Sequence, residues 1–185
     1  MTPPSLLPPW AEVSPERLAH IGRVAGLAER WADRMRISPA ERDRWLRAVW
    51  LHDALRDATP ATLDHWAAET AGQGALRHGP ASAARAAADG ETDRGVLDAV
   101  RYHSVGWADW DMVGRVLYCA DYLEPGRTFQ RERRAGLAER FADDPAGVLF
   151  AVAGERLANI IGSGLPLIDP TVRFWNSLVA SSGSR

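Results

Sequence analysis

Five prolines in this chain directly follow a residue whose side chain can cap a helix. The pairs are Ser14-Pro15, Ser38-Pro39, Thr59-Pro60, Asp144-Pro145 and Asp169-Pro170. A Ser, Thr or Asp oxygen at the N-cap accepts a backbone hydrogen bond, and the fixed φ of proline suits the first helical position. The sequence therefore predicts a helix after each pair, and Ser38 with Glu41 also has the spacing of a capping box.

The apolar residues behind these starts recur at intervals of three and four, which is the period of a helix with one buried face. One such stripe consists of Leu18, Ile21, Val24, Ala28, Trp31 and Met35. No segment alternates with a period of two, so we expect no strands. The pattern predicts an all-α fold of eight or nine helices. We place them near residues 15–36, 39–56, 60–71, 80–89, 93–103, 111–123, 131–141, 145–162 and 170–180.

The composition limits what such a chain binds. Its 22 basic and 24 acidic residues give a formal net charge of −2, which argues against binding nucleic acid or an anionic membrane through bulk positive charge. No stretch approaches the roughly 20 apolar residues of a membrane span. The N-terminus has neither the charged region nor the apolar run of a signal peptide. We therefore expect a cytoplasmic protein.

The length of 185 residues suits one domain. We expect this domain to span residues 13–180, after a flexible Pro-rich leader at 1–12 and before a flexible tail at 181–185. Cys119 is the single cysteine, so it forms no internal disulfide.

All 22 basic residues are arginines, and the chain contains no lysine. A P-loop NTPase needs a phosphate-binding lysine, and Schiff-base enzymes need a lysine amine. Both classes are therefore excluded. Any anion is bound by arginine, histidine, backbone groups or a metal.

Four of the five histidines and two aspartates fall at positions that the helical pattern predicts to be buried. They are His20, His52, Asp53, His78, His103 and Asp121. Taken singly, a buried His or Asp is more often a hydrogen-bonded core residue than a ligand. Two buried carboxylates among several imidazoles, however, need a cation or several donors, and this favours a metal site. His65 lies in a polar helix and is left out.

The order of this set resembles the HD-domain metal-dependent phosphohydrolases, whose signature is a His, a His-Asp pair and a distant Asp on separate helices. The local strings narrow the resemblance to the YqeK family of HD hydrolases, which split diadenosine tetraphosphate symmetrically into two ADP. These strings are Leu51-His52-Asp53-Ala54-Leu55-Arg56-Asp57, Arg77-His78-Gly79-Pro80, Arg101-Tyr102-His103-Ser104 and Leu117-Tyr118-Cys119-Ala120-Asp121-Tyr122-Leu123-Glu124-Pro125-Gly126-Arg127. The similarity runs from about His20 to Asn176.

The resemblance implies a role for each matching residue. The metal ligands would be His20, His52, Asp53 and Asp121, with iron as the metal, although the chemistry of these ligands also suits manganese or zinc. The catalytic residues would be Asp53, His78 and His103. The substrate-binding residues would be His20, Arg56, His78, His103, Ser104, Arg127, Pro166, Leu167 and Ile168.

The chain departs from the family pattern at three places. Arg56 occupies a position where the family usually has lysine, so a guanidinium with two parallel donor groups replaces a compact ammonium. The stretch between His52 and His78 is shorter than usual. Trp107 and Trp110 occupy a loop where smaller or basic residues are expected.

Phosphoryl transfer needs charge neutralisation and alignment. A divalent ion held by two imidazoles and two carboxylates lowers the pKa of a bound water. His78 and His103 would donate to phosphate oxygens or protonate the leaving diphosphate.

We therefore expect a symmetrical dinucleoside tetraphosphate hydrolase. Its partner is expected to be a small nucleotide substrate, and we expect it to bind neither nucleic acid nor a membrane. A homodimer is possible. Another HD phosphohydrolase, such as a nucleotidase or guanosine polyphosphate hydrolase, is one alternative. A non-catalytic nucleotide-binding sensor is the other.

Overall fold

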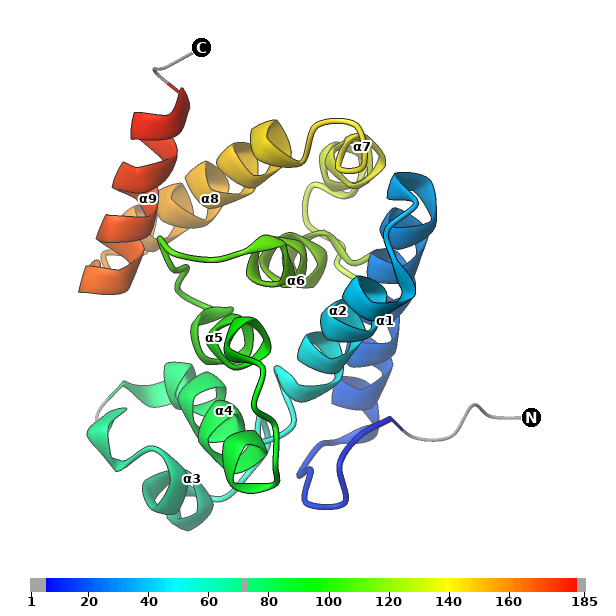
Figure 1. The fold of residues 1–185 in the computed structure, drawn as a ribbon. Coiled ribbons are helices and arrows are strands. Elements are labelled where there is room, and N and C mark those ends of the chain that lie inside the picture. Colours follow the sequence, from blue (N-terminus) through cyan, green and yellow to red (C-terminus); the bar gives the residue numbers. More distant parts are fainter. Residues whose placement is uncertain (1–5, 71–72, 183–185) are drawn as a thin grey trace.

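The computed structural model describes residues 6–70 and 73–182, and within them it contains α-helices and no strand (Figure 1). The all-α prediction is thus confirmed. The helices are α1 (Pro15–Met35), α2 (Pro39–Leu51), α3 (Pro60–Trp66), α4 (His78–Ala88), α5 (Arg94–Tyr102), α6 (Met112–Leu123), α7 (Arg131–Arg140), α8 (Pro145–Gly162) and α9 (Asp169–Ser182). Two short 3-10 turns, Ala68–Thr70 and Gly74–Arg77, lie between α3 and α4.

Four of the five predicted caps form. The side chains of Ser14, Ser38, Thr59 and Asp144 each accept a hydrogen bond from the backbone N–H three residues further on. The fifth helix, α9, begins at Asp169 itself, one residue earlier than predicted. Proline after a capping residue therefore locates helix starts to within a residue.

The bounds of α2, α3 and α4 differ clearly from the prediction. The helix α2 ends at Leu51 rather than near residue 56, because backbone bonds from Ala54 to Leu51 and from Arg56 to Asp53 replace the helical ones with tight turns. The helix α3 ends at Trp66 rather than near residue 71. The helix α4 begins at His78, before Pro80, since the first N–H groups of a helix have no intrahelical acceptor and proline loses nothing there.

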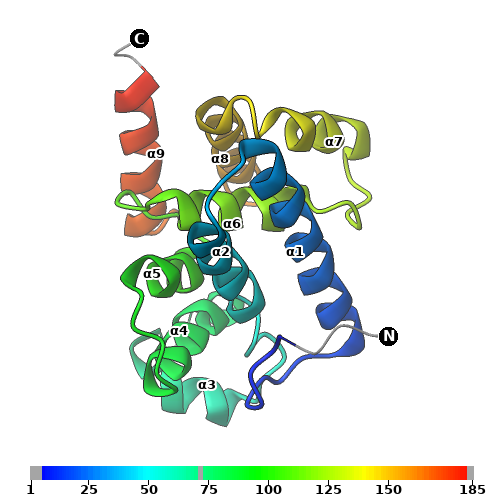
Figure 2. The same cartoon turned by 45° about the vertical axis from the view of Figure 1, so that its right-hand side comes forward.

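The helix α6 lies at the centre of the fold, and Figures 1 and 2 show it among the other helices. It contacts α1, α2, α5, α7 and α8. Nine of its residues are buried, which is expected of a helix that is apolar on all sides. Its last turn carries Asp121 into the interior.

The two tryptophans of the loop after His103 have packing roles. Trp110 is buried against Tyr118 and Phe174, and its indole N–H donates to the carbonyl of Asp98. Trp107 stacks on Tyr102 with the ring centroids 4.2 Å apart. These contacts anchor α9 and the loop to the core.

The described part of the predicted leader contacts the domain. The Trp10 indole donates to Asp89, and Arg85 lies over the same ring. The backbone N–H of Glu12 donates to the carbonyl of Ala54, next to the His-Asp pair. Residues 1–5 of the leader and 183–185 of the tail lie outside the described residues.

In the part of the chain that the structure describes, the helices are all too short or too polar to span a bilayer.

Candidate metal centre and adjoining pockets

Five elements bring the predicted set of six residues together in the interior. His20 comes from α1, His52 and Asp53 from the turn after α2, His78 from the start of α4, His103 from the end of α5 and Asp121 from α6. All six side chains are buried. We call these six residues the His/Asp cluster.

Asp53 is the hub of this cluster. Its Oδ1 lies 3.0 Å from His78 Nε2 and 3.6 Å from His103 Nε2. Its Oδ2 lies 3.5 Å from His52 Nε2 and 3.8 Å from His20 Nε2. One carboxylate therefore faces four imidazoles, which come from four different elements.

Three of the imidazoles are oriented by the same local contact. The Nδ1 atoms of His52, His78 and His103 lie 2.7, 2.6 and 2.8 Å from the backbone carbonyls of Val49, Ala75 and Val100. Since a carbonyl only accepts, each Nδ1 carries the proton and each Nε2 presents a lone pair. Such an outer hydrogen bond is typical of metal-binding histidines.

These lone pairs converge on the same space. His78 Nε2 lies 3.0 Å from His103 Nε2 as well as from Asp53 Oδ1, so three acceptor atoms face one another. The buried Nε2 of His52 has no hydrogen-bond partner among the described residues. Converging lone pairs are stable only around a proton or a cation, so the cluster fits a metal ion.

The cluster offers two overlapping ligand groups. His20, His52 and Asp53 form one, and Asp53, His78 and His103 form the other; in each, the ligand atoms lie within 4.8 Å of one another. Asp53 belongs to both groups. Imidazole nitrogen and carboxylate oxygen together suit a transition metal or zinc.

His20 has a different environment from the other three imidazoles. Its Nδ1 lies 3.3 Å from Glu124 Oε1, and its Nε2 lies 3.2 Å from Asp121 Oδ1. Burial favours the neutral ring, but the two carboxylates outweigh it and raise the pKa of His20 to about 9. For His52, burial prevails and lowers the pKa to about 4. A metal that binds His20 through nitrogen would therefore displace a proton.

Both aspartates of the cluster are ionised. Burial opposes their charge, but the imidazoles around Asp53 and the contact of Asp121 with His20, supported by Arg156 and Arg127, hold both pKa values well below the usual range. Asp121 also accepts from Arg127 at 3.0 Å and from Arg156 at 2.5 Å. The two carboxylates are thus in the form that binds a metal.

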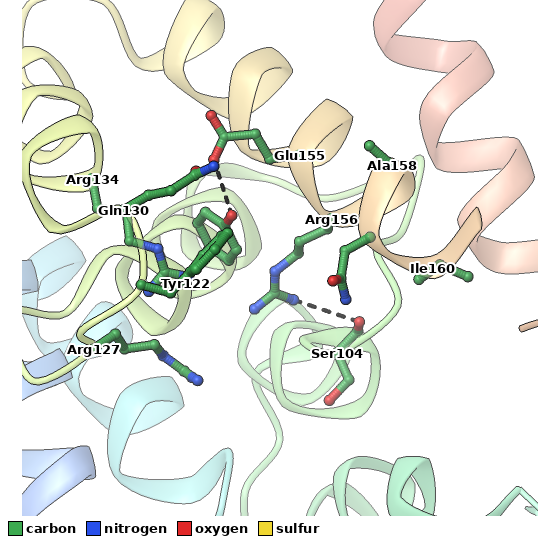
Figure 3. Close-up of a pocket in the computed structure, with 11 residues that line it drawn as sticks. Ser104, Tyr122, Arg127, Gln130, Arg134, Glu155, Arg156, Ala158 and Ile160 are labelled. Carbon is green, nitrogen blue, oxygen red and sulfur yellow. Dashed lines mark hydrogen bonds between the residues drawn. The ribbon is translucent and has the colours of Figure 1, made fainter. Parts of the chain in front are cut away.

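Two pockets open beside the cluster. One, of about 510 Å³, is lined by His20, Arg17 and Glu124 among others. The other, of about 560 Å³, lies between α6, α7 and α8 and is lined by Ser104, Tyr122 and Arg156 among others (Figure 3). Arg127, Phe129 and Arg134 line both pockets. We call them the His20 pocket and the Ser104 pocket.

The family model of the HD domain matches residues 17–126, which include all six residues of the His/Asp cluster. The chain belongs to the HD domain family. The match ends before α7, so α7, α8 and α9 lie outside the matched residues, and α7 and α8 supply one wall of the Ser104 pocket.

Curated relatives of this HD domain protein are named symmetrical bis(5'-nucleosyl)-tetraphosphatase. The one from Bacillus subtilis is 45% identical over 40 residues, which is 22% of each chain. The one from Halalkalibacterium halodurans is 24% identical over 90 residues, which is 49% of this chain and 47% of the relative. The matched stretches thus span less than half of these relatives.

The fold also resembles a solved structure described as a predicted HD superfamily hydrolase involved in NAD metabolism, from Clostridium acetobutylicum. The TM-score is 0.76, and the superposition covers 91% of this chain and 92% of that one. The sequence identity is 21%. This likeness shows that the arrangement of the helices is shared over nearly the whole chain, including helices that follow the residues matched by the family model.

The structure separates the predicted substrate-binding residues into two groups. Ser104 and Arg127 lie beside the cluster: the Ser104 hydroxyl is 3.1 Å from His103 Nε2, and Arg127 donates to Asp121. Arg56 is half-buried in the turn after Asp53. Burial of His78 is the main reason why the pKa of His78 is lowered, and the positive charge of Arg56 lowers it further. In contrast, Pro166, Leu167 and Ile168 lie in the exposed connection between α8 and α9, outside the lining of both pockets.

Three residues that contact the cluster were missing from the prediction. Arg17 donates to Asp53 Oδ2 at 2.8 Å, Glu124 contacts His20, and Arg156 donates both to Asp121 and to the carbonyl of His103. Glu124 lies within the string that carries the family resemblance, and Arg17 lies one turn before His20, so both had a local signal. Arg156 had none, because its contacts span at least 35 residues of sequence.

Proposed function

We propose that this chain hydrolyses dinucleoside tetraphosphates, diadenosine tetraphosphate in particular, at the middle of the phosphate chain to give two nucleoside diphosphates. The observation that carries the proposal is the pair of adjoining arginine-lined pockets beside the His/Asp cluster: His20 lines one of them, Ser104 next to His103 lines the other, and Arg127 lines both. A substrate with a nucleoside at each end of four phosphates matches this arrangement, because each pocket could take one half of it. The names of the curated relatives support the same reaction.

In this proposal, His20, His52, Asp53 and Asp121 hold a divalent metal, with iron as the first choice and manganese or zinc as the alternatives. When bound, such an ion lowers the pKa of water and neutralises phosphate charge. His78 and His103, which share Asp53 with the first ligand group, hold a second ion or contact the phosphates.

The reaction adds the oxygen of one water to a central phosphorus while the bond from that phosphorus to the central bridging oxygen breaks. The departing nucleoside diphosphate takes up a proton. As neutral rings whose Nδ1 atoms donate to backbone carbonyls, His78 and His103 present Nε2 lone pairs that would accept the proton of the attacking water, and the imidazolium formed would then give that proton to the departing diphosphate. Asp53 orients both rings from 3.0 and 3.6 Å.

The arginines of the site bind the remaining phosphate oxygens in this proposal. Arg127 reaches the rim of both pockets while it donates to Asp121. Arg56 forms no ion pair among the described residues, so its guanidinium is available for an anion. A guanidinium fork binds two oxygens of a phosphate at once, which a lysine does not do.

The test is a product analysis of the purified protein loaded with ferrous iron. We expect diadenosine tetraphosphate to yield ADP as the sole nucleotide product. ATP together with AMP would contradict symmetrical cleavage. Release of phosphate from AMP, or preferred hydrolysis of a guanosine polyphosphate, would indicate another HD phosphohydrolase, and binding without turnover with iron, manganese and zinc would indicate a sensor.

The contact of Pro166, Leu167 and Ile168 with a nucleoside and a cytoplasmic location are further parts of this proposal. Truncation of the exposed Leu167 to alanine tests the first: we expect a higher KM for the dinucleotide and an unchanged kcat. Cell fractionation tests the second.

A further inference from the structure

Arg134 on α7 is a buried cation without a carboxylate partner. The residue is 7% exposed. Among the described residues it forms no ion pair, and its Nε and Nη1 atoms have no hydrogen-bond partner. Burying a charge in this way is costly unless an anion compensates it.

The other buried arginine near the cluster shows what compensation looks like. Arg156 donates to a carboxylate oxygen of Asp121 and to the carbonyl of His103, and it lies over the Tyr118 ring at 4.3 Å. Arg134 lies over the Tyr122 ring at 4.0 Å and also interacts with the hydroxyl of that tyrosine, but no carboxylate pairs with it among the described residues. The hydrogen-bonding capacity of its Nε and Nη1 atoms is therefore left for a molecule outside the chain.

Arg134 is placed where an anion leaving the His/Asp cluster would meet it. It lines the His20 pocket, the Ser104 pocket and a third cavity of about 420 Å³ between α1 and α7. In Figure 3, Arg134 reaches in from α7, Arg156 from α8 and Arg127 from the segment after α6. Three guanidinium groups thus converge on one pocket from three segments.

The Ser104 pocket carries an excess of positive charge. Its one lining carboxylate, Glu155, is already bound by Arg133 and by the hydroxyl of Tyr122. At its rim stands Phe129, which is 69% exposed and also lines the His20 pocket. An exposed aromatic ring beside converging arginines is the combination that binds a nucleobase and its phosphates.

We infer that the Ser104 pocket is a second nucleotide subsite, in which Arg134 binds a phosphate and Phe129 stacks on the base of the substrate half that lies beyond the cleaved bond. This rests on the proposed function, since a dinucleotide has a second half to bind. The volume of about 560 Å³ is in the range of small-molecule sites. The ligand of the subsite is a nucleoside diphosphate moiety.

The experiment compares Arg134→Met with Arg140→Met as the matched control. Arg140 lies on the same helix, is 61% exposed in its side chain, pairs with Asp144 and lines none of these three cavities. Titration of the metal-loaded protein with ADP is expected to show two sites in the parent and in Arg140→Met, and one in Arg134→Met. The KM for diadenosine tetraphosphate should rise about 10- to 100-fold in Arg134→Met, with kcat little changed, because a charge-assisted hydrogen bond of the distal half is lost.

Stability separates this role from a structural one. Methionine of similar shape removes the uncompensated charge, so Arg134→Met should unfold at the same temperature as the parent or higher. A lower unfolding temperature together with two retained ADP sites would overturn the inference. Arg134→Lys, which keeps the charge, should recover part of the second site.

Phe129→Ala is the second variant, and its exposed position makes misfolding no obstacle. We expect it to weaken the second ADP site about tenfold, as loss of base stacking does, while Phe129→Trp retains that site. Equal binding by all Phe129 variants would contradict the stacking role. If the parent binds two ADP but hydrolyses no dinucleotide, the proposed function fails and the subsite stands; if it hydrolyses the dinucleotide but binds a single ADP, the subsite fails.

Discussion

Two clusters of charged residues in this protein satisfy their electrostatics in opposite ways. The first, which we call the Arg44 cluster, consists of Glu41, Arg44, Asp93 and Asp111, and the guanidinium of Arg44 lies 2.7, 2.6 and 2.6 Å from the three carboxylates. It joins α2, the N-cap of α5 and the N-cap of α6. All its charges are paired within the chain.

The His/Asp cluster also consists of buried ionisable groups, but not all of them have partners within the described residues. Its imidazole nitrogens present lone pairs to one another and to Asp53, and the Nε2 of His52 has no hydrogen-bond partner in the described residues. Arg134, which lines the adjoining His20 pocket, is buried and forms no ion pair in the part of the chain that the structure describes. The comparison teaches that pairing within the chain is typical of a structural cluster, whereas buried and unpaired groups indicate a site for a ligand.

Asp53→Asn is expected to give the largest effect. The substitution removes the one anion that faces four imidazoles. Metal content should therefore fall at least tenfold and hydrolysis at least about 100-fold. This exceeds the loss that is typical when a residue that only orients a metal ligand is replaced. Elemental analysis and product assays measure both. Asp93→Asn is the matched control in the Arg44 cluster, and it should keep its metal; full metal content in Asp53→Asn would remove Asp53 from the ligand set.

Glu124→Gln should have the next largest effect. Glu124 holds the Nδ1 side of His20 from 3.3 Å, and its loss should weaken metal affinity about 10- to 100-fold without unfolding the protein. Competition with a chelator measures the affinity. An unchanged affinity would mean that His20 is oriented by packing alone.

Arg44→Met should destabilise the fold by about 1–2 kcal/mol, between the values typical of exposed and buried pairs, because three carboxylates are left facing one another. Denaturant unfolding measures the change. Metal content and activity per folded molecule should stay at the parent level. A loss of metal in this variant would show that the two clusters are coupled, and so would break the comparison.

The smallest effect is a pH dependence of stability. The hydrogen bond from Arg44 holds the pKa of Asp93 at about 2, below its ordinary value of 3.8. A lowered pKa adds stability above the unfolded value, so this contribution is full above about pH 4 and is lost as the pH falls toward 2. The free energy of unfolding, measured at several pH values between 5 and 2, should fall less with decreasing pH in Asp93→Asn than in the parent. An identical pH dependence in the two proteins would refute this role of Asp93.

Local sequence patterns predicted the helices because the forces that start them are local. A capping side chain and a proline act within one turn, and Ser14, Ser38, Thr59 and Asp144 form the caps that they predict. The end of α2 was predicted wrongly, because nothing in the residues after Leu51 is unfavourable to a helix. Tertiary contacts there, including the bond from Glu12 to Ala54, stabilise turns instead.

The six residues of the His/Asp cluster were expected from their types and positions; the structure places five of them in the two ligand groups, and Asp121 joins them through its contact with His20. Their hydrogen-bond partners were not all predictable. The Nδ1 contacts of three histidines go to carbonyls three residues earlier, so they follow from helix-end geometry once the boundary is known. The contacts of Arg156 with Asp121 and His103 join α8 to distant segments, and no local pattern indicates them.

The sequence by itself determined an all-helical chain that has arginine but no lysine for anions and that carries buried imidazoles and carboxylates. Those properties follow from residue type and spacing. The tertiary structure alone decided which arginines are used: Arg17 and Arg156 compensate the carboxylates of the cluster, while Arg134 is left unpaired beside two pockets. The physical reason is that the cost of a buried charge depends on what lies within a few ångströms of it, and that is set by the packing of helices far apart in the chain.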